Sequence, residues 1–138
     1  MSTTTRILFV CLHGAAKSVL AAADCRRLAR ARGLDVTAAS AGTEPDVAIA
    51  PGVVRTLLAE GLDLSDQQPR KVTSADTAAA SRIVAFGCDL RDVAAPGVAV
   101  EQWTDVPPVG DDLPAARAVI RQHLERLLDE CAAGGPRR

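Results

Sequence analysis

Short apolar runs alternate with longer amphipathic segments along this chain of 138 residues. Unbroken apolar or β-branched runs of strand length are typical of strands that are buried on both faces. The longer segments repeat their apolar residues at helical spacing and carry charges on the opposite side. These patterns predict strands over residues 6–10, 34–39, 82–87 and 98–102, and helices over residues 17–32, 51–60, 74–80 and 112–131.

The order of these elements predicts one α/β domain over residues 1–138, with a tail over about residues 133–138. Strands that alternate with helices form βαβ units with right-handed crossovers, which give a parallel sheet with helices on both faces. Such sheets bind ligands at the carboxyl ends of their strands. Four polar or reactive residues follow successive strands and should meet at that edge: Cys11, Thr43, Cys88 and Asp105.

The loop between the first strand and the first helix has the order of an anion-binding turn. Its small residues let the backbone curl around a tetrahedral anion, and backbone N–H groups and the positive end of the helix dipole point at that anion. The same pattern also fits an ordinary helix entry, with Cys11 as a core residue. The candidate oxyanion-binding residues follow Cys11 directly: Leu12, His13, Gly14, Ala15, Ala16 and Lys17.

Cys11 has the surroundings of a reactive thiol. Helix N-termini and neighbouring cations favour the thiolate form of cysteine, and Lys17 and a protonated His13 would be those cations. We predict that Cys11 attacks phosphorus to form a covalent intermediate, and that Ser18 donates a hydrogen bond to the sulfur. Asp105, in a proline-rich loop after the fourth strand, is the candidate acid that protonates the leaving oxygen and then activates water. Taken singly, Asp105 also fits a turn residue.

Composition narrows the classes of function. The 16 basic and 17 acidic residues nearly cancel and form no basic stripe with aromatic residues, which argues against a nucleic-acid partner. No apolar stretch approaches the roughly 20 residues of a membrane span, and the first residues lack the pattern of a signal peptide. We therefore expect a cytoplasmic protein with no membrane partner.

The cysteines and histidines are few and far apart in the sequence. Four separated cysteines and two histidines predict free thiols and no metal site. Cys25 and Cys131 lie on predicted helices and should be core or surface thiols. His123 lies in the middle of the last predicted helix and should be solvated.

The stretch from Cys11 to Ser18 resembles the Cys-x5-Arg-Ser loop of the low-molecular-weight protein tyrosine phosphatases and of the thioredoxin-coupled arsenate reductases that share their fold. The likeness continues in order through residues 40–43, 61–65, 83–88 and 103–107. It implies a four-stranded parallel sheet with flanking helices. It also implies Cys11 as the nucleophile, Ser18 as its hydroxyl partner and Asp105 as the general acid, with no cofactor for a phosphatase.

The chain departs from the family pattern at three places. Lys17 stands where the family has arginine, and a lysine offers a point charge in place of a planar fork of donors. We expect oxyanion binding to persist and transition-state stabilisation to weaken by a few kcal/mol. Gly14 replaces the loop asparagine, and Val106 separates Asp105 from the proline that usually follows this aspartate.

Three functions remain open at this level. The first is hydrolysis of a phosphomonoester, phosphotyrosine included, although the chain has no tyrosine and Trp103 is the aromatic residue expected near the site. The second is arsenate reduction, in which Cys88 matches the family's second cysteine. Residues 93–96, where the third would lie, hold no thiol, so an external thiol or thioredoxin-like redoxin would supply electrons. The third is a weak or inactive phosphate- or phosphoprotein-binding module, because Lys17 replaces arginine. Cys88 also fits a buried thiol at a strand end.

Overall fold

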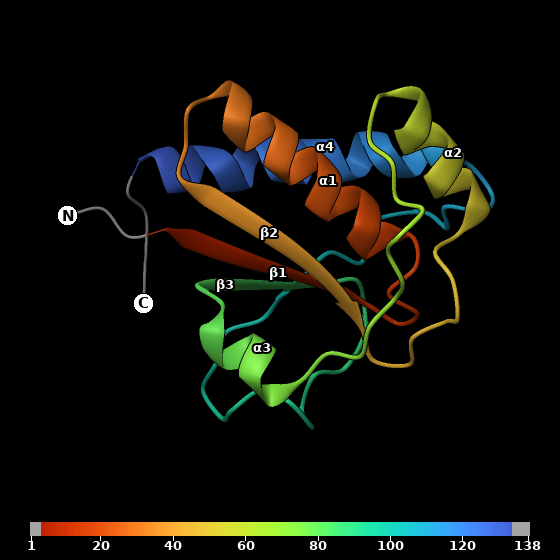
Figure 1. Ribbon diagram of the computed structural model, residues 1–138. Helices are drawn as coiled ribbons and strands as arrows, with labels where there is room; N and C mark the ends of the chain where they lie inside the picture. Colours follow the sequence, from red (N-terminus) through yellow and green to blue (C-terminus); the bar gives the residue numbers. More distant parts are fainter. Residues whose placement is uncertain (1–3, 134–138) are drawn as a thin grey trace.

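Four parallel strands form one sheet, whose carboxyl ends lie together (Figure 1). The computed structural model describes residues 4–133, so the predicted tail lies outside the described residues except for Ala133, the C-cap of the last helix. The strands are β1 (Thr5–Cys11), β2 (Val36–Gly42), β3 (Arg82–Ala85) and β4 (Glu101–Gln102), in the order β2-β1-β3-β4. The predicted parallel sheet is confirmed.

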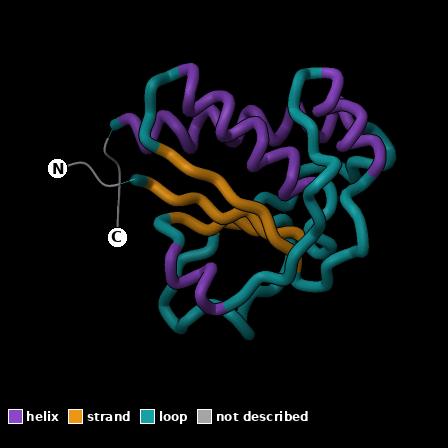
Figure 2. The backbone as a smooth tube through the Cα atoms, viewed as in Figure 1, coloured by secondary structure: helices purple, strands orange, loops and turns teal. Residues whose placement is uncertain are grey.

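Helices cover both faces of the sheet, as predicted. Two long helices, α1 (Lys17–Ala31) and α4 (Leu113–Ala132), lie on one face, together with α2 (Pro51–Ala59) (Figure 1). The short helix α3 (Ser74–Ala79) lies on the other face. Loops gather around the carboxyl ends of the strands, where a parallel sheet places its ligands (Figure 2).

The second strand differs most from its predicted bounds. The sequence predicts a strand over 34–39 and a loop from residue 40, whereas β2 runs from Val36 to Gly42. It begins later because Gly33 has a φ of 68° and the Leu34 N–H bonds back to the last turn of α1 at Ala29 O. It ends later because its small residues continue the pairing with β1 as far as Cys11 opposite Gly42.

The third and fourth strands are shorter than predicted. β3 stops at Ala85 rather than at residue 87, and Gly87 turns the chain with a φ of 82°. Only two residues of the predicted strand over 98–102 pair with β3, because the Val98 N–H closes a turn on Ala95 O. β4 is therefore only a short addition to the sheet edge.

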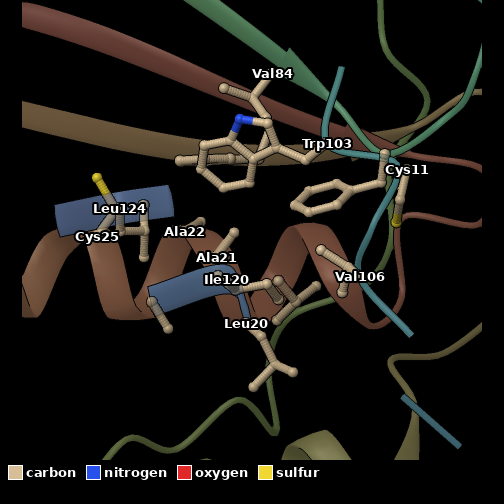
Figure 3. Close-up of a cluster of buried hydrophobic side chains, with 14 of the residues drawn as sticks. Cys11, Leu20, Ala21, Ala22, Cys25, Val84, Trp103, Val106, Ile120 and Leu124 are labelled. Carbon is tan, nitrogen blue, oxygen red and sulfur yellow. The ribbon is translucent and has the colours of Figure 1, made fainter. Parts of the chain in front are cut away.

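The main hydrophobic core lies between the sheet and the layer of α1 and α4. Trp103 packs against Phe9 and Phe86, with ring centroids 5.9 and 5.7 Å apart. Figure 3 shows Trp103 and Val106 in this cluster with Cys11 beside them. The packing of Trp103, which directly follows β4, thus brings the loop after β4 toward the end of β1.

A buried charge network ties three helices together behind the core. Asp24 of α1 accepts two hydrogen bonds from Arg117 of α4, at 2.8 and 2.9 Å. Arg117 also binds Glu60, the C-cap residue of α2, at 2.6 Å. Hydrogen bonds from Arg117 and Arg27 lower the pKa of Glu60 to about 2. Because a buried charge without a partner is costly, this network fixes how α2 and α4 sit on α1.

Candidate active site

The loop between β1 and α1 curls tightly because two glycines allow two backbones to meet. Gly14 has a φ of 59°, in the left-handed region that favours glycine. A Cβ built on Gly14 would lie 2.8 Å from Gly42 N, and one built on Gly42 would lie 2.5 Å from Gly14 N. The glycine that replaces the family's asparagine therefore packs directly against the end of β2.

The outer side of the loop is held by the segment that follows β2. The carbonyl oxygens of Cys11, Leu12, His13 and Ala15 accept hydrogen bonds from amides within residues 43–50, at 2.7 to 3.2 Å. In a planar trans peptide the C=O and the following N–H point in opposite directions. The four N–H groups of these peptides thus turn away from the segment, and in the described part of the chain the amides of residues 12–16 donate no hydrogen bond.

These amides and the start of α1 form a cradle of N–H groups, which is the geometry that suits an oxyanion. Ala16 is the N-cap of α1 and offers no side-chain cap, and the first turn of α1 contains no acidic residue. Uncapped amides at a helix N-terminus attract anions. The backbone arrangement that the prediction requires is therefore present, and anion binding by this loop stays a prediction.

Cys11 and Ser18 meet at the base of the cradle. Cys11 Sγ lies 3.1 Å from Ser18 Oγ, and either atom can donate. Both side chains are buried, and Ser18 is the second residue of α1. A hydroxyl at this distance can stabilise a thiolate, which accepts hydrogen bonds.

A cavity of about 270 Å³ opens over the loop, and Lys17 is among the residues that line it. Lys17 is half-buried, and it forms no ion pair or side-chain hydrogen bond with any residue in 4–133. Its ammonium group is therefore available to an anion. The remaining lining comes from loop residues 11–16 other than Gly14 and from residues that sequence reasoning missed: Asp46, Ala50, Phe86, Val109 and Gly110.

The missed lining residues come from three loops at the same edge of the sheet. Phe86 follows β3 and lines the cavity, whereas Trp103, the aromatic residue expected near the site, is buried in the core and is not among the lining residues. The only signal in the sequence was position, because each of these loops follows a strand or leads into a helix at the carboxyl edge.

His13 and Asp46 pair at the mouth of the cavity. His13 Nδ1 lies 3.4 Å from Asp46 Oδ1 and 3.3 Å from Glu44 O. The Asp46 N–H also donates to His13 O at 3.1 Å. Backbone and side chain together therefore join the loop to the segment after β2.

Asp105 lies outside this cavity. Its Oδ1 is 2.8 Å from His123 Nε2 on α4, and the residue is not among those that line the cavity. The hydrogen bond from His123 holds the pKa of Asp105 below its usual value. The next residue, Val106, is buried in the core.

The prediction that His123 is solvated is wrong. Its ring stacks on Trp103 with a centroid distance of 4.5 Å and an interplanar angle of 14°. Its side chain is 23% exposed, because the loop after β4 crosses that part of α4. The sequence held no signal for this contact between residues 103 and 123.

The other three cysteines lie after β3, in α1 and in α4. Cys88 is buried after β3, and its Sγ donates to Val10 O at 3.3 Å, one residue before Cys11. Burial raises the pKa of the Cys88 thiol, and the nearby Cys11 adds to that rise. Cys25 is buried in α1, where desolvation raises its pKa to about 12, and Cys131 lies half-buried near the end of α4.

Residues 4–133 contain no group of three or more histidine, cysteine, aspartate or glutamate residues that could hold a metal ion. None of the described helices is long and apolar enough to cross a membrane.

Comparison with known proteins assigns the family. The sequence model of the low molecular weight phosphotyrosine protein phosphatases matches residues 6–101, so the chain belongs to this family. A curated relative from Halobacterium salinarum, named "Putative arsenate reductase", is 29% identical over 133 residues, which cover 93% of this chain and 94% of the relative.

Solved structures of other proteins share this fold over nearly the whole chain. YfkJ from Bacillus subtilis superposes with a TM-score of 0.84 at 23% identity and covers 98% of this chain and 99% of its own. The thioredoxin-dependent arsenate reductase of Corynebacterium glutamicum gives a TM-score of 0.77 at 26% identity, over 96% of this chain and 64% of its own. The family resemblance and the predicted fold are confirmed, and both phosphatases and arsenate reductases are among the relatives.

Proposed function

We propose that this protein hydrolyses a phosphomonoester through a cysteinyl-phosphate on Cys11. The observation that carries the proposal is Cys11 Sγ at the base of the amide cradle, 3.1 Å from Ser18 Oγ. A thiolate held there faces an oxyanion bound by the loop amides, which is the arrangement that nucleophilic displacement at phosphorus needs.

The loop residues divide the remaining work. The amides of residues 12–16 and the N-terminus of α1 hold the phosphoryl oxygens. Lys17 places a positive charge beside the same anion, without the bidentate hydrogen bonds that an arginine would donate. Ser18 stabilises the sulfur as an anion when it leaves phosphorus in the second step.

The reaction also needs a proton donor for the leaving oxygen. Asp105 is the residue that the sequence and the family pattern predict for this role. Its carboxylate is bonded to His123 and does not line the cavity, so Asp105 would have to exchange partners before it could donate.

The size and lining of the cavity favour a small or slender phosphorylated group. Among the described residues that line it, Phe86 is the one phenylalanine, tyrosine or tryptophan. A phenol ring would find one aromatic wall and otherwise the aliphatic side chains of residues such as Leu12 and Val109. A phosphorylated small molecule or an exposed phosphorylated side chain is therefore the proposed substrate class.

Cys88 supports arsenate reduction as a second candidate. Arsenate bound to Cys11 would be released as arsenite when the Cys88 thiolate attacks Cys11 sulfur, so that the two thiols lose two electrons and form a disulfide. A dithiol redoxin or an external thiol would then reduce that disulfide, since residues 93–96 offer no further cysteine. A phosphate-binding module without turnover is the third candidate.

One set of assays separates these functions. We expect wild type to hydrolyse p-nitrophenyl phosphate and Cys11→Ser to lose that activity, while Cys131→Ser, a thiol substitution at the far end of α4, keeps it. Lys17→Arg should raise the rate, because a planar fork binds the transition state better. Hydrolysis that survives in Cys11→Ser would refute the nucleophilic mechanism. Arsenate-dependent oxidation of a redoxin without ester hydrolysis would establish the reductase instead.

A further inference from the structure

The cavity over the loop has its own acid–base group, separate from Asp105. Among the described residues that line it, His13 is the only histidine and Asp46 the only carboxylate. Asp105 is engaged on α4 by His123 at 2.8 Å. The acid–base groups that line the cavity together with Cys11 are therefore not the ones that the family pattern predicts.

The contacts of His13 decide which ring nitrogen is available. Nδ1 faces two acceptors, Glu44 O at 3.3 Å and Asp46 Oδ1 at 3.4 Å. A nitrogen that faces acceptors alone carries the proton. Nε2, on the other side of the ring, has no hydrogen-bond partner among residues 4–133.

We propose that His13 Nε2 is the proton donor and acceptor of the reaction and that Asp46 is its positioning residue. This inference rests on the proposed hydrolysis at Cys11. His13 is two residues from the nucleophile and lines the same cavity. A histidine oriented through Nδ1 by a carboxylate, with Nε2 toward the substrate, is a recurrent arrangement for general acid–base catalysis.

The proton follows the phosphoryl group through two steps. In the first, Cys11 Sγ bonds to phosphorus while the bond from phosphorus to the leaving oxygen breaks, and that oxygen takes the proton of the His13 imidazolium Nε2. In the second, neutral Nε2 takes a proton from water as the water oxygen bonds to phosphorus. The sulfur leaves with its electron pair, and His13 is again an imidazolium.

The groups around His13 come from three segments. Asp46 and Glu44 lie on the segment after β2, Cys11 ends β1 and Lys17 begins α1. The Asp46 carboxylate lies 3.4 Å from Nδ1 and so orients the ring from that side, while Nε2 has no partner among residues 4–133.

The test compares two aryl esters whose leaving groups need a proton to different degrees. We expect His13→Asn to lower kcat/KM for phenyl phosphate about 100-fold, the scale of general acid catalysis. The loss should be clearly smaller for p-nitrophenyl phosphate, because nitrophenolate leaves without a proton. His123→Asn is the matched control at the other histidine and should show no such dependence on the leaving group.

The same two esters test the part played by Asp46. Asp46→Ala should reproduce part of the leaving-group-dependent loss of His13→Asn, and Asp46→Glu should restore the rate, because the carboxylate beside Nδ1 orients the ring. Equal losses on both esters in His13→Asn would overturn the proposal. So would a leaving-group-dependent loss in Asp105→Asn that His13→Asn does not share. If wild type hydrolyses neither ester, the proposed function itself fails.

Discussion

Each of the two histidines of this chain faces an aspartate, but the two pairs lie in different surroundings. His13 and Asp46 are 3.4 Å apart at the mouth of the cavity, and their side chains are 54% and 55% exposed. His123 and Asp105 are 2.8 Å apart, and the His123 ring is stacked on Trp103 and only 23% exposed. The same two residue types therefore make one loose pair and one packed pair.

The contacts of the two rings decide which pair can exchange a proton with a ligand. Arg126 donates to His123 Nδ1 at 3.4 Å, so Nε2 carries the proton and donates the hydrogen bond to Asp105. Both nitrogens of His123 are thus engaged, and the pair ties the loop after β4 to α4. His13 keeps Nε2 without a partner among the described residues. Substitutions in the first pair should change turnover, and those in the second should change stability.

The largest expected effect comes from breaking the support of the His13 pair. Gly42→Ala would place a Cβ 2.5 Å from Gly14 N and push the loop away from the end of β2. Misplacing donors of an oxyanion site typically costs about 100-fold or more in rate. We expect that loss of kcat/KM for p-nitrophenyl phosphate, together with weaker binding of inorganic phosphate measured by calorimetry.

Gly52→Ala is the matched control for this substitution. Gly52 lies in the first turn of α2, and a Cβ there would have its nearest neighbour at 3.9 Å, an ordinary contact. Its phosphate affinity should match that of wild type. Unchanged phosphate binding in Gly42→Ala would show that the close approach of the two glycines does not shape the cradle.

A smaller effect is expected from removing the packed histidine. His123→Ala loses the stack on Trp103 and the hydrogen bond to Asp105, each typically worth about 0.5–1.5 kcal/mol. The free energy of unfolding in urea should therefore fall by about 1–3 kcal/mol. His13→Ala should lower the free energy of unfolding much less, because the His13 ring is half exposed. A larger loss in His13→Ala would reverse the contrast between the two pairs.

The sequence predicted the strand–loop–helix order around Cys11 well because it depends on neighbours in the chain, whereas the role of Cys11 as nucleophile stays a prediction. A buried strand, a turn of small residues and a helix start occupy residues 5–31 without a break, and the structure has them in that order. Small residues weakened the signal for β2, whose bounds follow from pairing with β1 and from the contact of Gly42 with Gly14.

The partners of the two aspartates could not be predicted in the same way. Asp46 stands in a segment with no strand or helix, and its place at the cavity depends on the hydrogen bonds between that segment and the loop. Asp105 meets His123 only because α4 packs beside the loop after β4. Contacts between elements decide both side-chain positions, and no local pattern records them.

The smallest expected effect concerns the pH dependence of the packed pair. The hydrogen bond from His123 lowers the pKa of Asp105 below the ordinary value of 3.8, so the carboxylate stabilises the fold above that pH. This contribution is lost as the pH falls through the lowered pKa. Because Asp105 is 62% exposed, we expect less than about 1 kcal/mol.

The free energy of unfolding, measured from about pH 6 down to about pH 3, reports this contribution, because aspartate titrates in the lower part of that range. Asp105→Asn should be less stable than wild type at the upper end, and the difference should shrink toward the lower end. Asp46→Asn is the comparison at the loose pair, where a half-exposed carboxylate lies farther from its histidine. A stronger pH dependence in Asp46→Asn than in Asp105→Asn would mean that the cavity pair, not the α4 pair, carries the structural charge.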